Sequence, residues 1–350
     1  MSDLSDDPVI HGLEVYLVGG AVRDELLGRP VADRDWVVVG ATPEQMTQRG
    51  FRPVGADFPV FLHPDSHEEY ALARTERKTR AGHQGFEFYA APEVTLEQDL
   101  VRRDFTINAM ARSPEGQIID PFQGQQHLRQ GVLEPVSQAF TEDPLRVVRA
   151  ARFLAQMPEL HESEHFHQYL PGMRDELATL SVERLWQEAY KAFSGQPGRF
   201  FQALARWDCW QALNLEPPQM TQITPGNSPE NALAQWLWQT RFDAQDWLTQ
   251  WRAPKRWQAL HQDLAHWDGA MAFACLKRAG ALKNTPRSQR LLSALMAAQA
   301  IDEHATRRAL AAAMGVRRED VDPNLTGPAL GQALERLQQD AFERAFGPGL

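Results

Sequence analysis

The sequence predicts an α+β N-terminal domain followed by an all-α C-terminal region, and three observations carry this prediction. Up to about residue 140, short runs of β-branched and aromatic residues alternate with turn residues, as in a mixed sheet. Beyond that point, apolar residues recur at helical spacing, as in the run from Val182 to Phe193. Prolines then cluster within residues 214–229, which predicts a linker or long loop between helices.

Length and charge bound the possible functions. The chain has 350 residues, 43% of them hydrophobic, and a formal net charge of -10, so it is long enough for two or more globular domains. No overall positive field draws it to nucleic acid, and any RNA binding requires a local basic surface. The acidic N-terminus lacks an apolar signal region and no run reaches membrane-spanning length, so a soluble cytoplasmic protein is expected. Cys209 and Cys275 are too far apart in sequence for a zinc pattern and are expected to be buried.

The first elements form a candidate phosphate site. Residues 15–18 predict a short buried strand, Gly19 and Gly20 a turn, and residues 21–27 a helix that ends at Gly28. A glycine turn leading into a helix exposes backbone N–H groups to an anion. Arg23, one turn into the helix, is placed to donate to a triphosphate oxygen.

Two carboxylates follow at the mouth of the next predicted strand, residues 36–39. Side chains on extended chain alternate between faces, so Asp33 and Asp35 point the same way. Mg²⁺ is usually held by one or two protein carboxylates, with substrate phosphates and water as the other ligands. A pair of such ions can stabilise the attacking and leaving oxygens of an in-line displacement. The sequence therefore predicts phosphoryl or nucleotidyl transfer.

Further strands are predicted over residues 60–62, 70–73, 86–89 and 118–119. Glu68 and Glu69 precede the second of these, and either is a candidate third carboxylate that the sequence does not place. Residues 74–91 combine basic side chains with glycines, a composition that indicates a mobile loop or a plain polar connection.

The segment LVRRDFTINAMA, residues 100–111, is the second informative block. Arg102, Arg103 and Asp104 precede what the pattern predicts as an apolar helix start, so they are expected above a site while Phe105 and Met110 pack beneath it. Standing alone, such a cluster is usually a solvated group of ions.

The segment TEDPLRVVRAARF, residues 141–153, predicts a helix that begins near Pro144, with Thr141 or Asp143 as its cap. Arginines recur every three residues on one side and apolar residues fall largely on the other. Without other evidence, this pattern is typical of an amphipathic surface helix.

In their order, these blocks resemble the nucleotidyltransferase signature of the DNA polymerase β superfamily. GGAVRDELLGRPVADRDW is close to the form found in bacterial class II tRNA nucleotidyltransferases, the CCA-adding enzymes, and bacterial poly(A) polymerases share the same core. The resemblance implies a polymerase β-like palm as the catalytic head (residues 1–140) and a helical neck that recognises the nucleobase (141–213). It also implies an all-α body and tail that holds tRNA (214–350).

The resemblance also assigns residues to roles. Asp33 and Asp35 would be the catalytic Mg²⁺ ligands. Arg103 would contact the nucleotide and Asp104 would accept a hydrogen bond from the ribose hydroxyl. The complete predicted nucleotide site is Gly20, Arg23, Arg103, Asp104, Asp143, Arg146, Arg149 and Arg152.

The motif EDPLR matches the family's E-D-x-x-R motif, and its chemistry follows from its groups. Asp143 accepts from an exocyclic amine while Arg146 donates to the neighbouring ring nitrogen or carbonyl. Cytosine and adenine offer that pattern, whereas uracil and guanine place a carbonyl against the carboxylate. The resemblance thus implies template-independent addition and repair of the tRNA 3′-CCA end with CTP and ATP. Arg149 and Arg152 are expected at the triphosphate.

Alternatives remain at this point. A poly(A) polymerase or an A-adding tRNA nucleotidyltransferase would share all three blocks, although the former usually carries a long basic C-terminal extension. A non-catalytic RNA-binding protein with the same fold is a more remote alternative. The region 74–91 corresponds to a loop implicated in the family's switch from CTP to ATP. No adjacent His-Asp pair occurs in the C-terminal half, so a phosphohydrolase domain is not expected.

Overall fold

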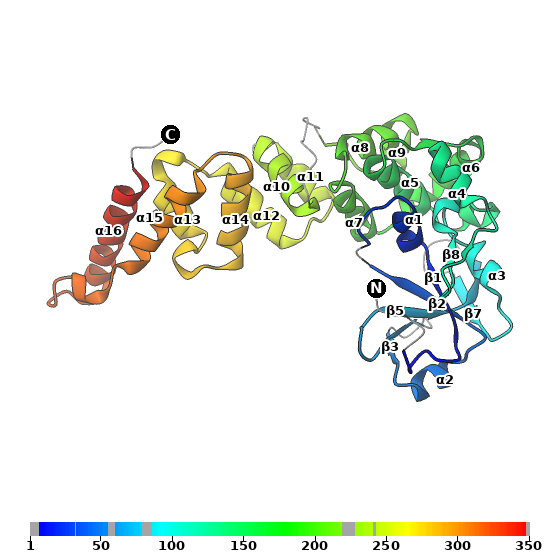
Figure 1. Ribbon diagram of the computed structural model, residues 1–350. Helices are drawn as coiled ribbons and strands as arrows, with labels where there is room; N and C mark the ends of the chain where they lie inside the picture. The colour runs from blue at the N-terminus through cyan, green and yellow to red at the C-terminus, as the bar shows by residue number, and fades with distance from the viewer. Residues whose placement is uncertain are drawn as a thin grey trace. The chain divides into compact units, whose positions relative to one another are not determined.

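A computed structural model describes residues 7–31, 33–54, 60–78, 86–218, 228–240 and 243–347. The chain divides into two compact units, one of residues 1–181 with 203–214 and the other of residues 182–202 with 215–350. The first unit holds the sheets and the predicted site, and the second is helical (Figure 1). This confirms the predicted α+β head and the all-α region after it.

The first unit is built on a seven-stranded sheet in the order β3-β4-β5-β2-β1-β8-β9. Its central pair, β1 and β2, is antiparallel, and β2 pairs with β5 in parallel so that Asp35 lies opposite Glu69. The strands of this sheet are β1 (Glu14–Val18), β2 (Asp35–Val39), β3 (Arg52–Val54), β4 (Val60–Leu62), β5 (Glu69–Leu72), β8 (Ala111–Arg112) and β9 (Ile118–Ile119). Two smaller sheets pair β6 (Arg74–Lys78) with β7 (Phe86–Ala90) and β10 (Val132–Leu133) with β11 (His161–Glu162).

The first unit also contains α-helices before, between and after these strands in the chain. They are α1 (Gly20–Leu26), α2 (Pro43–Gln48), α3 (Leu96–Leu100), α4 (Gly124–Gln130), α5 (Leu145–Gln156), α6 (Glu164–Arg174) and α9 (Cys209–Leu213). Gly28 follows α1 with φ +64°, the left-handed conformation that commonly ends a helix, as the sequence predicts.

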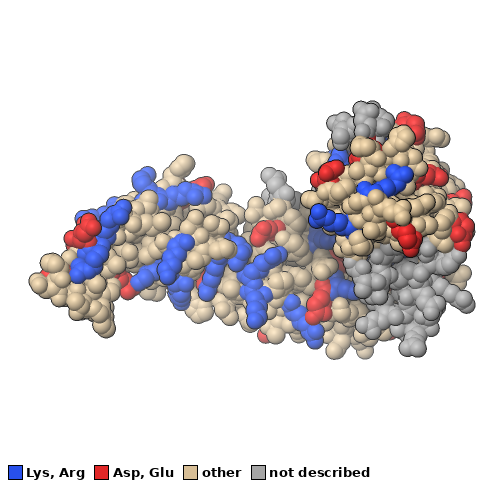
Figure 2. Space-filling model, turned by 90° about the horizontal axis from the view of Figure 1, so that it is seen from below, with Lys and Arg blue, Asp and Glu red and all other residues tan. Residues whose placement is uncertain are grey.

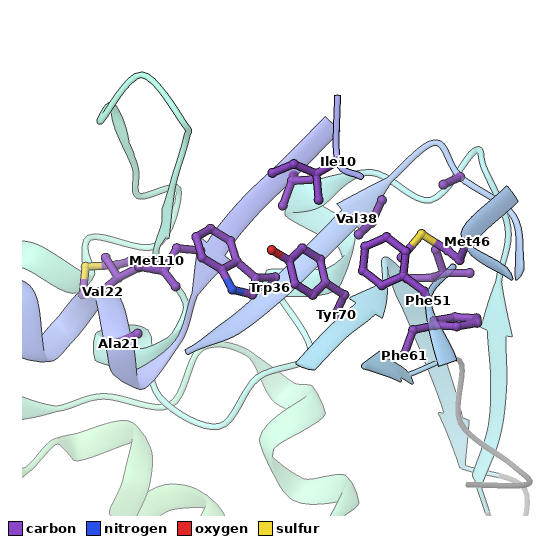
Figure 3. Packing of buried hydrophobic residues seen from close by; sticks show 14 residues of the cluster. Ile10, Ala21, Val22, Trp36, Val38, Met46, Phe51, Phe61, Tyr70 and Met110 are labelled. Carbon is purple, nitrogen blue, oxygen red and sulfur yellow. The ribbon is translucent and has the colours of Figure 1, made fainter. Parts of the chain in front are cut away.

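Both faces of β1 and β2 are buried, because alternate residues enter two different clusters. Trp36 and Val38 pack with Leu17 and Tyr70 on one face, where the Trp36 and Tyr70 rings stack with centroids 5.6 Å apart. Figure 3 shows this row of side chains running from Val22 of α1 to Phe61 of β4. Val18 and Val37 pack on the opposite face with Leu100 of α3. Asp35, the first residue of β2, lies two residues before Val37, so its side chain is on the same face of the sheet as Val37 and α3.

The second unit is a succession of helices, which follow one another from α10 to α16 (Figure 1). They are α7 (Val182–Ala192), α10 (Pro229–Gln239), α11 (Ala244–Gln250), α12 (Lys255–Ala265), α13 (Ala272–Arg278), α14 (Pro286–Ala297), α15 (Glu303–Gly315) and α16 (Gly327–Phe346). The residues of α8 (Pro197–Arg206) are shared between the two units. Trp236, Trp247, Trp251 and Trp257 are buried, so these four indoles pack helices together.

The predicted helix start at Phe105 differs from the structure, whereas the prediction for the cysteines is confirmed. Cys209 and Cys275 are buried and free, as expected, and no helix in the described ranges is long and apolar enough to cross a bilayer. The predicted helix start at Phe105 is wrong, because residues 106–108 form a single 3₁₀ turn and the chain then enters β8. The Asn108 side chain donates to Asp104 and the Thr106 N–H pairs with the Glu134 carbonyl, so local polar contacts replace a helix. In the region 74–91, expected as a mobile loop or polar connection, residues 74–78 and 86–90 form the strands β6 and β7, and the second of these is the strand predicted at 86–89. Residues 79–85 lie outside the described residues, as do residues 219–227 of the linker predicted within 214–229.

The helix predicted to begin near Pro144 is α5, but it is not the exposed amphipathic helix of which its pattern alone is typical. Its apolar residues are buried, and so are Arg146 and Arg152, which are 9% and 8% exposed. Only Arg149 among the twelve helix residues, besides the last residue Gln156, is not buried. Burying guanidinium groups costs free energy unless they are paired, so their partners define the site described next.

Candidate active site

The turn between β1 and α1 brings two arginines against glycine backbone. Gly19 has φ +72°, and a Cβ atom there would lie 2.9 Å from Nη1 of Arg103. A Cβ at Gly20 would lie 3.4 Å from Nη2 of Arg23. Glycine is needed at position 19 because the backbone is left-handed there and because a side chain would collide with the Arg103 guanidinium. Two positive charges, on Arg23 and Arg103, flank the turn.

Asp33 and Asp35 are both exposed at the start of β2. Partial desolvation by the surrounding protein raises the pKa of Asp35, the Arg103 charge lowers it, and the neighbouring Asp33 carboxylate raises it. The two carboxylates are thus close enough to repel each other. A divalent cation between them would remove that repulsion, so this pair of hard oxygen donors fits the metal that the chemistry requires.

The two glutamates that the sequence left unplaced have different surroundings. Glu68 accepts a hydrogen bond from the Trp36 indole at 2.8 Å and lies 3.5 Å from Arg34. Glu68 therefore contacts Arg34 and Trp36, the residues that alternate with Asp33 and Asp35 along the chain. Glu69 is exposed and in register with Asp35 on the neighbouring strand. Within the described ranges, no three acidic, histidine or cysteine side chains are grouped to bind a metal.

Arg23 is held by polar contacts on both sides. Its Nε and Nη2 atoms donate to Asp24 at 3.0 Å each, and Nη1 donates to the Asn108 amide oxygen at 2.5 Å. Asn108 also donates to Asp104 at 3.0 Å. The sequence interpretation missed Asn108, although its position four residues after Asp104 was a usable signal, because one turn of chain brings such a pair together.

Asp104 is buried and fully engaged. Its Oδ2 accepts from Nε and Nη2 of Arg149 at 2.7 and 2.6 Å, and its Oδ1 accepts from Asn108 and from the Phe105 N–H. Burial would raise the pKa of Asp104, but Arg149 and the Asn108 hydrogen bond outweigh burial and hold the pKa well below its usual range. The ion pair joins α5 to the segment 102–108.

A second contact docks the start of α5 on the same segment. Arg146 donates from Nη1 to the Ala139 carbonyl at 2.7 Å and from Nη2 to the Arg102 carbonyl at 2.5 Å. Asp143 accepts from the Leu145 N–H at 3.0 Å, but the cap position of α5 is Pro144, so neither Thr141 nor Asp143 is the cap residue that the sequence predicted. Arg152 contacts Gln156 at 2.8 Å and lies over the Phe153 ring.

The fold therefore brings most of the predicted site residues into one unit. Arg23 and Arg103 lie against the glycine turn that contains Gly20, and the Arg103 charge lowers the pKa of Asp35. Arg146 and Arg149 join α5 to the segment that carries Arg102 and Asp104. Two residues that sequence reasoning missed, Asn108 and Asp99, organise these arginines.

Comparison with known proteins identifies the head. Residues 15–134 match the family model described as the poly A polymerase head domain. A CCA-adding enzyme of Coxiella burnetii is 57% identical over 204 residues, which cover 57% of this chain and 54% of that protein. The multifunctional CCA protein of Laribacter hongkongensis is 56% identical over 208 residues, 59% of this chain and 51% of that protein. The chain thus spans about half the length of the curated relatives it matches.

Solved structures extend the likeness of fold to nearly the whole chain. The Bacillus stearothermophilus CCA-adding enzyme in complex with CTP aligns with a TM-score of 0.65 and 23% identity over 96% of this chain and 93% of that one. The Thermotoga maritima enzyme complexed with tRNA aligns with a TM-score of 0.53 and 20% identity over 94% of this chain and 87% of that one. The N-terminal part of this chain is therefore similar in sequence to CCA-adding enzymes, and nearly the whole chain shares the fold of such enzymes.

Proposed function

We propose that this protein adds the 3′-terminal CCA of tRNA by transferring nucleotides from CTP and ATP, with release of diphosphate. One observation carries the proposal: α5, which bears Arg146 and begins just after Asp143, is docked through the Arg102 carbonyl onto the segment whose Arg103 lies against the glycine turn and beside Asp35. Groups suited to base, phosphate and metal thus share one scaffold. Its substrate makes the cytoplasm the expected compartment.

Asp33 and Asp35 would hold Mg²⁺, which supplies charge stabilisation at the attacking and leaving oxygens of a phosphoryl displacement. The rest of the work falls to the chain. Arg23 and Arg103 flank the glycine turn, where their charges oppose those of a triphosphate. Arg149 and Arg152 extend this positive charge along α5. Because Arg23 and Arg149 are already fixed by Asn108 and Asp104, little rotamer entropy remains to be lost on binding.

Base selection would come from the start of α5. Asp143 offers an acceptor for an exocyclic amine, and Arg146 a donor for the ring atom beside it. Arg146 is held by the carbonyls of Ala139 and Arg102, and Asp143 by the Leu145 N–H. Both residues are therefore fixed at the start of α5. Such a fixed pair needs no nucleic-acid template.

Binding of tRNA requires positive charge that the chain as a whole lacks. Residues 251–300 carry eight Lys and Arg against two Asp and Glu, although the net charge of the chain is -10. Figure 2 shows Lys and Arg side chains along one face of the second unit with few acidic side chains between them. Such a face provides the local basic surface that phosphate contacts need.

The test is incubation with tRNA that lacks CCA and each labelled nucleotide in turn. We expect sequential incorporation of two C and one A, which stops after A. Incorporation of A alone would favour an A-adding enzyme, and a continuing A ladder would favour a poly(A) polymerase.

Replacing Asp143 by alanine tests the base selection. We expect kcat/KM for CTP and ATP to fall by the equivalent of about 2–3 kcal/mol, the loss typical of a hydrogen bond to a charged group. Incorporation of UTP relative to CTP is expected to rise, because the acceptor that opposes the uracil carbonyl is gone. Steady-state kinetics with the four nucleotides measures both effects.

Asp143→Asn is the companion variant, since the amide oxygen of asparagine can still accept from the Leu145 N–H. Its amide also donates, which suits a carbonyl, so we expect a larger shift toward UTP in this variant than in Asp143→Ala. If both variants keep the preference for CTP over UTP, Asp143 does not select the base.

A further inference from the structure

A buried carboxylate that the mechanism above does not use lies behind Arg103. Asp99, in α3, is 0% exposed. Its Oδ1 accepts from Nη2 of Arg102 at 2.8 Å and its Oδ2 accepts from Nη2 of Arg103 at 3.2 Å. The two oxygens of one side chain therefore hold two successive guanidinium groups, of which one lies against Gly19.

The same carboxylate also holds the first residue of the β6–β7 hairpin. Oδ1 of Asp99 accepts from the Arg74 N–H at 3.3 Å, and Nε of Arg102 donates to the Arg74 carbonyl at 3.1 Å. Arg74 opens β6 and pairs with Ala90, the last residue of β7. The root of this two-stranded sheet is therefore tied, through Asp99, to the arginines of the candidate active site.

We infer that Asp99 is a positioning residue that sets Arg103 for the incoming nucleotide and couples occupancy of that site to the β6–β7 hairpin. The inference rests on the proposed function in one respect, that Arg103 faces the nucleotide. The buried Nε of Arg103 has no hydrogen-bond partner in the described part of the chain. When a bound nucleotide phosphate attracts Arg103, the hydrogen bond from Arg103 to Asp99 changes. Asp99 also accepts from the Arg74 N–H, so the change reaches the start of β6.

Charge, and not shape alone, is needed at this position. Burial would raise the pKa of Asp99, but Arg103 and Arg102 outweigh burial and hold the pKa below its usual value. The group is therefore a carboxylate that faces two cations and a backbone donor. An amide of the same size has one acceptor oxygen and adds an N–H donor, so it cannot accept from both arginines and Arg74.

Asp99→Asn is the first test. We expect KM for CTP and for ATP to rise about 10-fold, the equivalent of one lost charge-assisted hydrogen bond, while kcat changes less than about threefold and the preference for CTP over UTP is unchanged. In an Arg103→Ala background the same substitution should raise KM by less than about twofold, because Asp99 is proposed to act on the nucleotide through Arg103, which this variant lacks. Independent, multiplicative effects of the two substitutions would overturn the positioning role.

Hydrogen exchange of the hairpin is the second test and requires no turnover. With saturating Mg–CTP or inorganic tripolyphosphate, we expect slower exchange of the β6 and β7 amides in the unmodified chain and no slowing in Asp99→Asn. Equal slowing in both proteins at saturation would overturn the coupling. The matched control is Asp263→Asn, because Asp263 is buried and pairs with Arg287 through both oxygens at 2.7 and 2.8 Å in the second unit. It should lose comparable stability without altering hairpin exchange.

The outcomes separate this inference from the proposed function. If the unmodified chain binds Mg–CTP and shows the exchange effect but extends no tRNA, CCA addition fails and the coupling stands. If it adds CCA and Asp99→Asn behaves as the unmodified chain, the coupling fails and CCA addition stands. Failure of the unmodified chain to bind either ligand would overturn both.

Discussion

Replacing Asp35 or Asp33 by alanine is expected to abolish incorporation of both CTP and ATP, by about 10³-fold or more. Both side chains are exposed at or just before the start of β2, and in the proposed function they hold the metal that stabilises charge on the reacting oxygens. The free energy of unfolding should change by less than about 1 kcal/mol, as for other surface substitutions. Nucleotide incorporation into tRNA and urea denaturation measure the two quantities.

Asp65→Ala provides the control, because Asp65 is also an exposed carboxylate of the head and has no proposed part in catalysis. It should retain full activity. Addition of a strong chelator should reproduce the loss in the unmodified protein, and excess Mg²⁺ should reverse it. Retained activity in Asp35→Ala or Asp33→Ala would refute the metal assignment.

Replacing Arg149 by alanine is expected to destabilise the fold by about 3–5 kcal/mol, because it leaves the buried Asp104 carboxylate without its cation. Asp104 is 7% exposed and Arg149 donates to it twice. The loss should be visible as a lower urea midpoint with an unchanged slope. A further Asp104→Asn substitution should restore part of the stability, since it removes the orphaned charge.

The pH dependence of this variant follows from the same pair. In the unmodified chain the pKa of Asp104 is depressed, so its contribution to stability is present above the ordinary carboxyl pKa and is lost as pH falls through the folded value. Without Arg149, burial raises that pKa. The penalty of the variant should therefore shrink as the pH falls through this raised pKa, because the folded variant then binds a proton at Asp104 that the unmodified folded chain does not bind.

Arg29→Ala is the comparison for the Arg149 result. Arg29 pairs with Glu159, and both side chains are exposed, 39% and 47%, so their separation should cost less than about 1 kcal/mol. If Arg149→Ala is as stable as Arg29→Ala, the Asp104–Arg149 pair does not hold α5 to the head.

Local features of the site followed from sequence because their causes are local. A glycine turn after a buried strand and the helix end at Gly28 each depend on a few neighbouring residues. Alternation along a strand likewise put Asp33 and Asp35 on one side of extended chain. The resemblance carried by these blocks supplied the roles of residues far apart in the chain.

The helix predicted at Phe105 was wrong, and the partners of the α5 arginines did not follow from the sequence pattern, for a common reason. Both depend on contacts between segments that are distant in sequence. Asn108 joins Asp104 to Arg23 of α1, and the α5 arginines bury their charges on Asp104 and on the carbonyls of Ala139 and Arg102. Periodicity reports only which residues share a face, and not whether a partner covers that face.

The sequence by itself thus determined the class of fold, the order of the strands and turns around Gly19 and Asp35, and the inventory of charged groups available for nucleotidyl transfer. Only the tertiary structure decided which of those charges pair with one another: Asp104 with Arg149, and Asp99 with both Arg102 and Arg103. The physical reason is burial. A buried ion must find an opposite charge or hydrogen-bond partner wherever the fold places one, and that partner can lie 45 residues away, as Arg149 does from Asp104.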